Sequence, residues 1–165
     1  MGLVGGDVTL EEAKRAFFEE AKQDGAVCPC CERFGKVYKR KLHSSMVAVL
    51  LLLYRHRSLG FVHVHTLINQ MSDPRVAAAI RGDFAKLRYW GLIEEGFEVQ
   101  ENEDKKHNGT WRITENGCLF AEGKLRVYSR IWLYNTKYLG VADYNTVDVH
   151  EALRDKFSYR ELMGL

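Results

Sequence analysis

Residues 73–123 limit the fold of this chain more than any other stretch. Asp73 followed by Pro74 is typical of a helix start, and Gly91 is typical of a helix end. Between them, apolar residues recur at the spacing of one helix face, namely Val76, Ile80, Phe84 and Leu87. The stretch therefore predicts one long helix over residues 74–90. Small residues and cations occupy its other face, which could approach a phosphate backbone: Arg75, Ala78, Gly82, Lys86 and Tyr89.

A two-stranded hairpin is predicted directly after this helix. Residues 92–100 and 109–114 have the composition of strands, and the dipeptide Asn108-Gly109 predicts the turn between them. Three bases are then expected near the hairpin tip: Lys105, Lys106 and His107. Acids on or beside the first strand would repel phosphates unless they face away: Glu94, Glu95, Glu98, Glu101, Glu103 and Asp104. Thr114 predicts the start of a short closing helix, and side-chain caps elsewhere in the chain predict helix starts at Thr9 with Glu12, at Ser44 or Ser45, and at Asp148 with Glu151.

Two segments of this stretch resemble the third helix and wing of winged helix-turn-helix domains. They are residues 87–94 (LRYWGLIE) and residues 109–117 (GTWRITENG). The resemblance implies a first helix over residues 46–56, a short strand over residues 61–64 and a second helix over residues 65–71. The alternative is a helix packed on a hairpin in an unrelated α+β domain.

Charge is strongly segregated along the chain, although the net charge is only +2. Residues 33–72 contain seven bases and no acid, whereas residues 1–32 carry a net charge of −4. Such an acid-free span predicts a phosphate-binding surface, the alternative being a solvated basic loop without a partner. Tyr38 lies among its cations, as expected where bases and phosphates are bound together.

Three of the four cysteines lie in the tetrapeptide CPCC at residues 28–31. Cys28 and Cys31 have the C-x-x-C spacing of a metal knuckle, in which two thiolates converge on one tetrahedral zinc. His43 is a candidate third ligand, and further candidates are His63, His65 and Cys118. The sequence thus predicts half of a structural zinc site. The alternatives are a degenerate knuckle with buried thiols and no metal, or a redox pair.

Composition indicates a globular protein of the cytoplasm. Apolar residues make up 46% of the chain, and its longest apolar run is nine residues, about half the length that spans a bilayer. We find neither a secretory signal nor the cysteine pattern of a secreted disulfide framework. No catalytic constellation and no Gly-rich phosphate loop are evident, so we do not expect an enzyme.

The predicted fold class is α+β, with a winged helix-turn-helix core. Residues 1–41 are expected to hold an N-terminal helix, a zinc-knuckle-like loop and the basic stretch. Residues 42–123 are expected to form the winged helix domain. Residues 124–165 are expected to form a β-hairpin and a short helix that pack on it.

The predicted C-terminal hairpin offers a second candidate surface. Its strand pattern puts aliphatic residues on one face, and aromatic residues with arginines on the other: Arg126, Tyr128, Arg130, Trp132 and Tyr134. This face could bind nucleic-acid bases or a host protein. Alternatively, the C-terminal tail or a second subunit in a homodimer covers it.

Several of these segments together resemble small uncharacterised proteins of phages and prophages, which implies a protein of the host cytoplasm. The leading hypothesis is a non-enzymatic, double-stranded DNA-binding regulator. The expected DNA-contacting residues are Lys36, Lys39, Arg40, Lys41, Arg75, Arg81, Lys86, Arg88, Lys105, Lys106 and Arg112. The alternative is a phage-type module that binds a host protein through the face from Arg126 to Tyr134.

Overall fold

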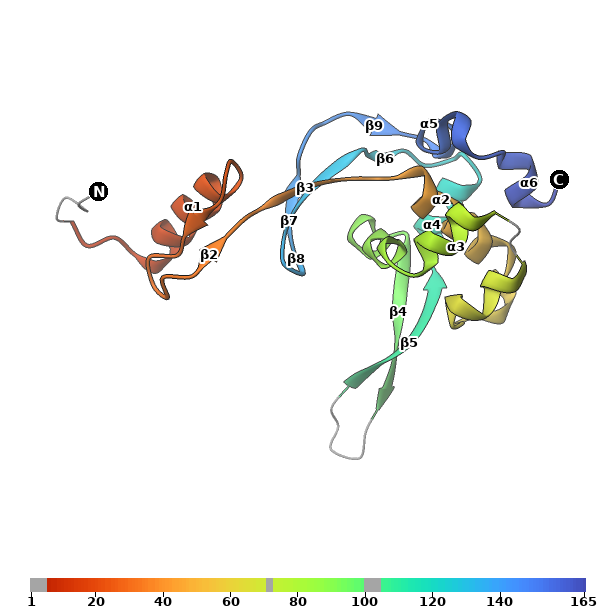
Figure 1. Ribbon diagram of the computed structural model, residues 1–165, viewed down its shortest axis with the longest axis horizontal. Helices are drawn as coiled ribbons and strands as arrows, with labels where there is room; N and C mark the ends of the chain where they lie inside the picture. The colour runs from red at the N-terminus through yellow and green to blue at the C-terminus, as the bar shows by residue number, and fades with distance from the viewer. Residues whose placement is uncertain (1–5, 71–72, 100–104) are drawn as a thin grey trace. The chain divides into compact units, whose positions relative to one another are not determined.

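The computed structural model describes residues 6–70, 73–99 and 105–165. Within this part of the chain the fold is α+β, and its strands form four small sheets. The chain divides into two compact units (Figure 1). The first unit is Met1–Arg40 with Arg130–Asp143, and the second unit is Lys41–Ser129 with Tyr144–Leu165.

The first unit combines one helix with short strands from both of its segments. Its elements are α1 (Leu10–Ala21), β1 (Ala26–Val27), β2 (Phe34–Gly35), β3 (Tyr38–Lys41), β7 (Arg130–Tyr134) and β8 (Lys137–Val141). β1 pairs with β2, and β7 lies between β3 and β8. A small cluster of buried residues in this unit consists of Phe17, Ala21, Ala26 and Val37, and the half-buried rings of Trp132 and Tyr134 pack against it.

The second unit is mostly helical. Its α-helices are α2 (Ser44–Arg55), α3 (Pro74–Ile80), α4 (Glu115–Ala121), α5 (Val149–Leu153) and α6 (Tyr159–Met163). Its 3-10 helices are η1 (Arg57–Leu59), η2 (Val64–Gln70), η3 (Asp83–Trp90) and η4 (Arg154–Lys156). Its strands are β4 (Ile93–Val99), β5 (Lys105–Ile113), β6 (Val127–Tyr128) and β9 (Thr146–Val147). β4 pairs with β5 in a hairpin that extends away from these helices, and β6 pairs with β9 (Figure 1).

Helix α2 is the centre of the second unit. Residues 46–53 are all buried, as expected for a helix that is apolar on every side. The predicted stripe of Val76, Ile80, Phe84 and Leu87 is also buried in this core. Its burial removes these side chains from water and fixes which face of the 74–90 segment points inward.

The prediction of one continuous helix over residues 74–90 is wrong. α3 ends at Ile80, and Gly82 has φ −139° and ψ −82°, which no helix contains. η3 then starts at Asp83 with the tighter 3-10 geometry. Because glycine has no Cβ atom, its backbone reaches this non-helical conformation at little steric cost, and the segment bends at Gly82. The cations before and after Gly82 therefore do not share the face of a single helix.

The predicted turn at Asn108-Gly109 is also wrong, because both residues lie inside β5. They form an irregularity in the ladder, where the pairing shifts between Glu95 and Phe97. The Asn108 Oδ1 accepts hydrogen bonds from the Thr110 backbone N–H at 3.0 Å and from its hydroxyl at 2.5 Å. Gly109 has φ +74°, a conformation that suits a bulge as well as a turn.

The elements before the 74–90 segment differ in detail from the prediction. Instead of a strand over residues 61–64, a single antiparallel bridge joins Val62 to Trp111. The helix predicted over residues 65–71 is the 3-10 helix η2, which starts at Val64. Among the described residues, we find no helix with the length and apolarity needed to cross a membrane.

Several predicted helix starts are confirmed. Thr9 with Glu12, at α1, forms a reciprocal capping box. The Thr114 hydroxyl accepts the Gly117 backbone N–H at 3.0 Å, which caps α4. At α2 the predicted serine cap is wrong, because His43 occupies the N-cap position and its side chain makes no capping hydrogen bond.

Candidate nucleic-acid interface

The predicted DNA-contacting cations lie in both units. Lys36, Lys39 and Arg40 belong to the first unit, on or beside β3. The others belong to the second unit: Lys41, Arg75, Arg81, Lys86, Arg88, Lys105, Lys106 and Arg112. The two groups differ in what their charged ends contact.

Arg75 is bound by an acid and an aromatic ring of its own unit. Its guanidinium donates to the Asp73 carboxylate at 2.7 Å, and its Cζ lies 4.3 Å from the centre of the Phe157 ring. Hydrogen bonds from Arg75 hold the pKa of the Asp73 carboxyl below its ordinary value. Asp73 therefore competes with any phosphate for this arginine.

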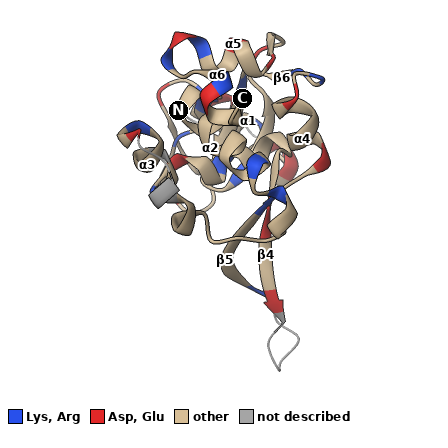
Figure 2. Cartoon of the chain, turned by 90° about the vertical axis from the view of Figure 1, so that its right-hand side faces the viewer, with Lys and Arg blue, Asp and Glu red and all other residues tan. Residues whose placement is uncertain are grey.

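The bases around η3 and the hairpin are paired in the same way. Lys86 pairs with Asp83, and Arg112 pairs with Glu94 across the β4–β5 ladder. Glu95 accepts from Arg88 at 3.2 Å and from His107 at 2.8 Å. Figure 2 shows bases and acids next to one another in this unit. Two of the acids that were expected to repel phosphates, Glu94 and Glu95, thus partly neutralise Arg112 and Arg88.

The bases predicted near the hairpin tip do lie at that end of β5, where Lys105 is opposite Val99, the last described residue of β4. Lys106 is opposite Glu98, and His107 is opposite Phe97 in the register of the ladder. The side chain of Lys105, together with Glu101, Glu103 and Asp104, lies outside the described part of the chain.

Arg81 and Lys41, two further bases of the second unit, differ from those above in their surroundings. In the described part of the chain, no carboxylate lies within ion-pair distance of Arg81, which follows α3, or of Lys41. Most of the cations predicted around the 74–90 segment are nevertheless neutralised internally.

Two of the predicted cations of the first unit, Lys39 and Arg40, contact aromatic rings, whereas other cations of this unit, among them Lys22, pair with acids. The Lys39 Nζ lies 5.1 Å from the centre of the Trp132 ring, and the Lys22 Nζ lies 5.7 Å from it. The Arg40 Cζ lies 4.9 Å from the centre of the Tyr38 ring. Across the described residues, no ion pair involves Lys36, Lys39 or Arg40. Cation–π contacts leave the net positive charge in place, so these bases remain available to anions.

Cys28 lies at the start of a tight backbone loop. Its backbone N–H donates to the Arg33 carbonyl at 2.9 Å, and its carbonyl accepts the Glu32 N–H at 2.9 Å. Glu32 has φ +58°, which closes the loop. Hydrogen bonds from Cys31 and Cys30 hold the pKa of the Cys28 thiol below its ordinary value. The loop therefore favours the thiolate, which is the form that binds metals.

The remaining predicted ligands are distributed differently. Cys31 is exposed beside Cys28 in the first unit, whereas His43 belongs to the second unit. Cys118 is half-buried, and burial raises the pKa of its thiol. Among the described residues, no three His, Cys, Asp or Glu side chains are grouped as metal ligands. The two thiols of the loop would need further ligands to complete a tetrahedral zinc site.

A pocket that the sequence did not reveal adjoins this loop in the first unit. It has a volume of about 480 Å³ and is lined by Cys28, Cys31, Arg33, Phe34, Gly35, Lys36, Tyr38, Tyr134 and Asn135. A Cβ atom on Gly35 would lie 2.8 Å from the Phe17 ring and 2.9 Å from the Tyr134 ring. Glycine thus lets β2 approach these rings closely. In the sequence, Gly35 between Phe34 and Lys36 could have indicated that another segment approaches the backbone closely. It could not have indicated Tyr134, which is remote in the sequence.

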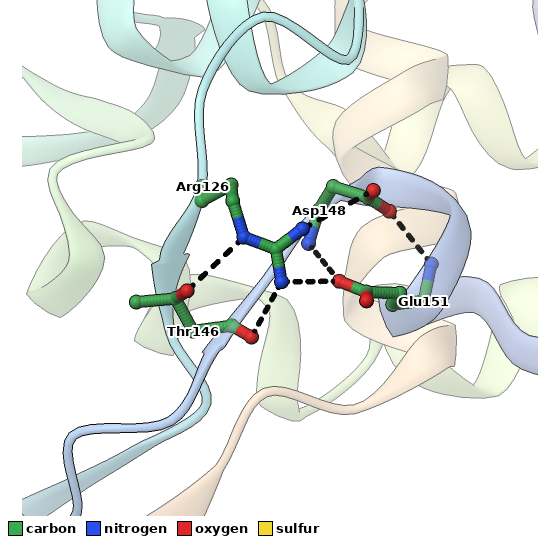
Figure 3. A network of polar contacts seen from close by, with 4 residues as sticks. All are labelled: Arg126, Thr146, Asp148 and Glu151. Atoms are coloured by element: carbon green, nitrogen blue, oxygen red, sulfur yellow. Dashed lines mark hydrogen bonds and ion pairs between the residues drawn. The ribbon is translucent and has the colours of Figure 1, made fainter.

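The predicted aromatic face from Arg126 to Tyr134 is divided between the two units. Its alternation is confirmed in β7, where Ile131 and Leu133 are buried and Trp132 is half-buried. Arg126, in the second unit, has its guanidinium bound within that unit. It donates to the Thr146 carbonyl at 2.9 Å and pairs with Asp148 at 3.4 Å and Glu151 at 2.7 Å (Figure 3). Tyr128 is 41% exposed and its ring lies against that of Tyr144.

Comparison of this chain with protein-family models, with curated proteins and with solved structures gives no match. The arguments for function therefore rest on the residues described above.

Proposed function

We propose that this chain is a non-enzymatic nucleic-acid-binding protein that attaches to double-stranded DNA chiefly through the basic segment around β3. One observation carries the proposal. Lys36, Lys39 and Arg40 have no acid partner among the described residues, and Lys39 and Arg40 lie over aromatic rings. Cations in this state can bind phosphates without first losing an internal ion pair.

The proposal includes a winged-helix role for the second unit. The order of α2, η2, α3 with η3, and the β4–β5 hairpin supports it, as does the bridge from Val62 to the hairpin. In this role, Arg81 would contact phosphates directly, whereas Arg75, Lys86, Arg88 and Arg112 would have to exchange their carboxylate partners for phosphates. By its resemblance to phage and prophage proteins, the chain would act as a phage-type regulator in the host cytoplasm.

A salt titration of binding to random duplex DNA tests this proposal. Because each phosphate contact releases counterions, log K should fall with log salt by about 0.9 for each contact. Replacing Lys39, Arg40 and Lys41 with alanine should weaken binding to every sequence and flatten this dependence. Absence of binding at 50 mM salt, or an unchanged slope in the variant, would remove the basis of the proposal.

The proposal also includes a structural zinc held by Cys28 and Cys31, with His43 as the predicted third ligand. The backbone loop that favours the Cys28 thiolate supports it. Metal analysis of the purified chain, of Cys28→Ser and of Cys118→Ser as a control tests it. Zinc that is lost in Cys28→Ser and retained in Cys118→Ser is expected. Zinc-free protein would favour the degenerate knuckle or the redox pair, and titration of free thiols separates these two alternatives.

A protein-interaction module is the second candidate function. The exposed rings of Tyr128 and Tyr144, whose centres lie 6.3 Å apart, favour this function, because aromatic residues are enriched in interfaces. The partner would be a host protein or a second copy of this chain. Sedimentation velocity of the wild type and of a Tyr128→Ser/Tyr144→Ser variant tests the second copy, since only the wild type should then dimerise.

A further inference from the structure

We propose that the pocket between the cysteine loop and β7 binds an unpaired nucleotide, with the phosphate on Arg33 and Lys36 and the base against the rings of Tyr38 and Phe34. The inference rests on the proposed function, because the pocket lies in the same basic segment. It adds a different ligand, since a base stacked inside a Watson–Crick duplex cannot enter a pocket.

The size and charge of the pocket fit this ligand. Its volume of about 480 Å³ lies within the range of small-molecule sites, which is about 300–1,000 Å³. Its lining contains two cations, Arg33 and Lys36, and no acid. Within the described part of the chain, neither cation forms an ion pair. An anion entering the pocket therefore meets two cations that no carboxylate neutralises, and a Cys28 thiolate offsets only part of their charge.

The aromatic rings of the lining fit the other half of a nucleotide. Phe34 is 66% exposed and Tyr38 is 47% exposed, so both rings are accessible to a ligand. Arg40 lies over the Tyr38 ring. Tyr134 is held in place by edge-on contacts with Phe17 at 5.8 Å and Phe18 at 5.2 Å between ring centres. The exposed rings of Tyr38 and Phe34, next to this fixed ring, provide a stacking surface for a base of any sequence.

The polar groups of the lining favour recognition of a base edge as well. The Asn135 amide is exposed at the β7–β8 turn, where the residue has φ +53°. An amide both donates and accepts hydrogen bonds, as base edges do. Phosphate-binding cations, exposed rings and an amide together distinguish this pocket from a simple anion site. A free nucleotide and an unpaired nucleotide of a single strand both offer the phosphate and the base that these groups would bind.

Fluorescence anisotropy with the full chain tests the inference. The probes are labelled dT16, an abasic 16-mer with the same phosphates, and a blunt 16-bp duplex, with dTMP as a competitor. The wild type should bind dT16 about 5-fold or more tightly than the abasic strand, because stacking on one ring is worth about that factor. Equal binding of dT16 and the abasic strand would overturn the inference, and this comparison does not depend on any variant.

Variants then assign the preference to the pocket. Tyr38→Leu should abolish the preference for dT16, whereas Tyr38→Phe should keep it. Tyr138→Leu is the matched control, because Tyr138 is 45% exposed and does not line the pocket. Lys36→Gln should weaken both single strands more than Lys14→Gln does. An equal effect of Tyr38→Leu and Tyr138→Leu would refute the assignment.

The remaining probes separate this inference from the proposed function. If the duplex does not bind but dT16 is preferred over the abasic strand, the duplex proposal fails and the pocket stands. If the duplex binds but the preference is missing, the pocket fails and the duplex proposal stands. Competition by dTMP would identify a free nucleotide as a ligand, whereas preference for dT16 without such competition would identify the single strand; both results support an unpaired nucleotide.

Discussion

The predicted DNA-contacting cations beside β3 and those around η3 and the β4–β5 hairpin contact opposite kinds of group. In the second unit, Arg75, Arg88 and Arg112 are paired with carboxylates, whereas Lys39 and Arg40 in the first unit contact aromatic rings. An exposed ion pair contributes little to stability, yet it must be broken before its base can neutralise a phosphate. The positions of basic residues in a sequence therefore do not measure their availability. Whether a basic residue is available to a phosphate depends on the group that its charged end already contacts.

The largest expected effect comes from removing charge from one unit at a time. Replacing Lys36, Lys39 and Arg40 with glutamine should weaken duplex binding on the order of 10- to 100-fold at 100 mM salt, because three unpaired cations are lost. The matched variant replaces Arg75, Lys86 and Arg88 with glutamine and should weaken it less than about 3-fold. Anisotropy titrations measure both. A larger loss in the second variant would reverse the comparison.

The two units can also be compared by the reactivity of their cysteines, because Cys28 lies in the first unit and Cys118 in the second. Alkylation by iodoacetamide at pH 7.5 should be about 10-fold faster at Cys28 than at Cys118, because only the thiolate reacts. Hydrogen bonds from Cys31 and Cys30 lower the pKa of Cys28, and burial raises that of Cys118. Peptide mass spectrometry on chelator-treated protein gives the two rates.

The difference between these thiols should narrow as the pH rises above the pKa of both, where each is a thiolate. Equal rates at pH 7.5 would contradict the expected state of Cys28. Adding zinc should protect Cys28 if it is a ligand and should leave Cys118 unchanged.

A smaller effect is expected from a change that affects the second unit alone. Asp148→Ala removes the N-cap of α5 and a partner of Arg126 (Figure 3). The expected cost is about 1 kcal/mol in the free energy of unfolding, as for other N-cap losses. Urea denaturation measures it. Duplex and dT16 binding should stay unchanged, and a parallel loss of binding would show that the two units are coupled.

The smallest expected effect is a gain. Glu94→Gln with Glu95→Gln frees Arg88, His107 and Arg112 from their acids. Duplex affinity should rise about 2- to 4-fold if the hairpin lies near DNA, because new cations then meet phosphates. The control, Glu115→Gln with Glu161→Gln, removes the same charge elsewhere. An equal rise in both variants would indicate a general charge effect and leave the hairpin without a role.

Local signals in the sequence predicted local structure well. The caps at Thr9, Thr114 and Asp148 depend on residues within three positions, so the sequence contains all that is needed. The buried stripe of the 74–90 segment follows from its spacing in the same way. Glycine was the main source of error, because it suits several conformations. Gly109 was assigned to a turn but lies in a bulge, and Gly82 was assigned to a helix but lies at a break.

The candidate site was predictable only in part. The acid-free span pointed to Lys36, Lys39 and Arg40, because charge segregation is visible in the sequence. The rings of Trp132 and Tyr134 come from a distant segment, and no local pattern joins them to β2 or β3. The pairing of Arg112 with Glu94 likewise depends on the register of the hairpin, which the misplaced turn had shifted.

The division of the first unit into two segments has a consequence for synthesis on the ribosome. Residues 6–40 emerge early, but β7 and β8, with Trp132 and Tyr134, emerge only after the whole of residues 41–129. At about 5–20 residues per second, this delay is on the order of 5–20 seconds. During it, the nascent chain presents the cysteine loop and the basic segment before their aromatic partners exist. We therefore expect metal capture or oxidation at Cys28 to begin while the chain is still being made.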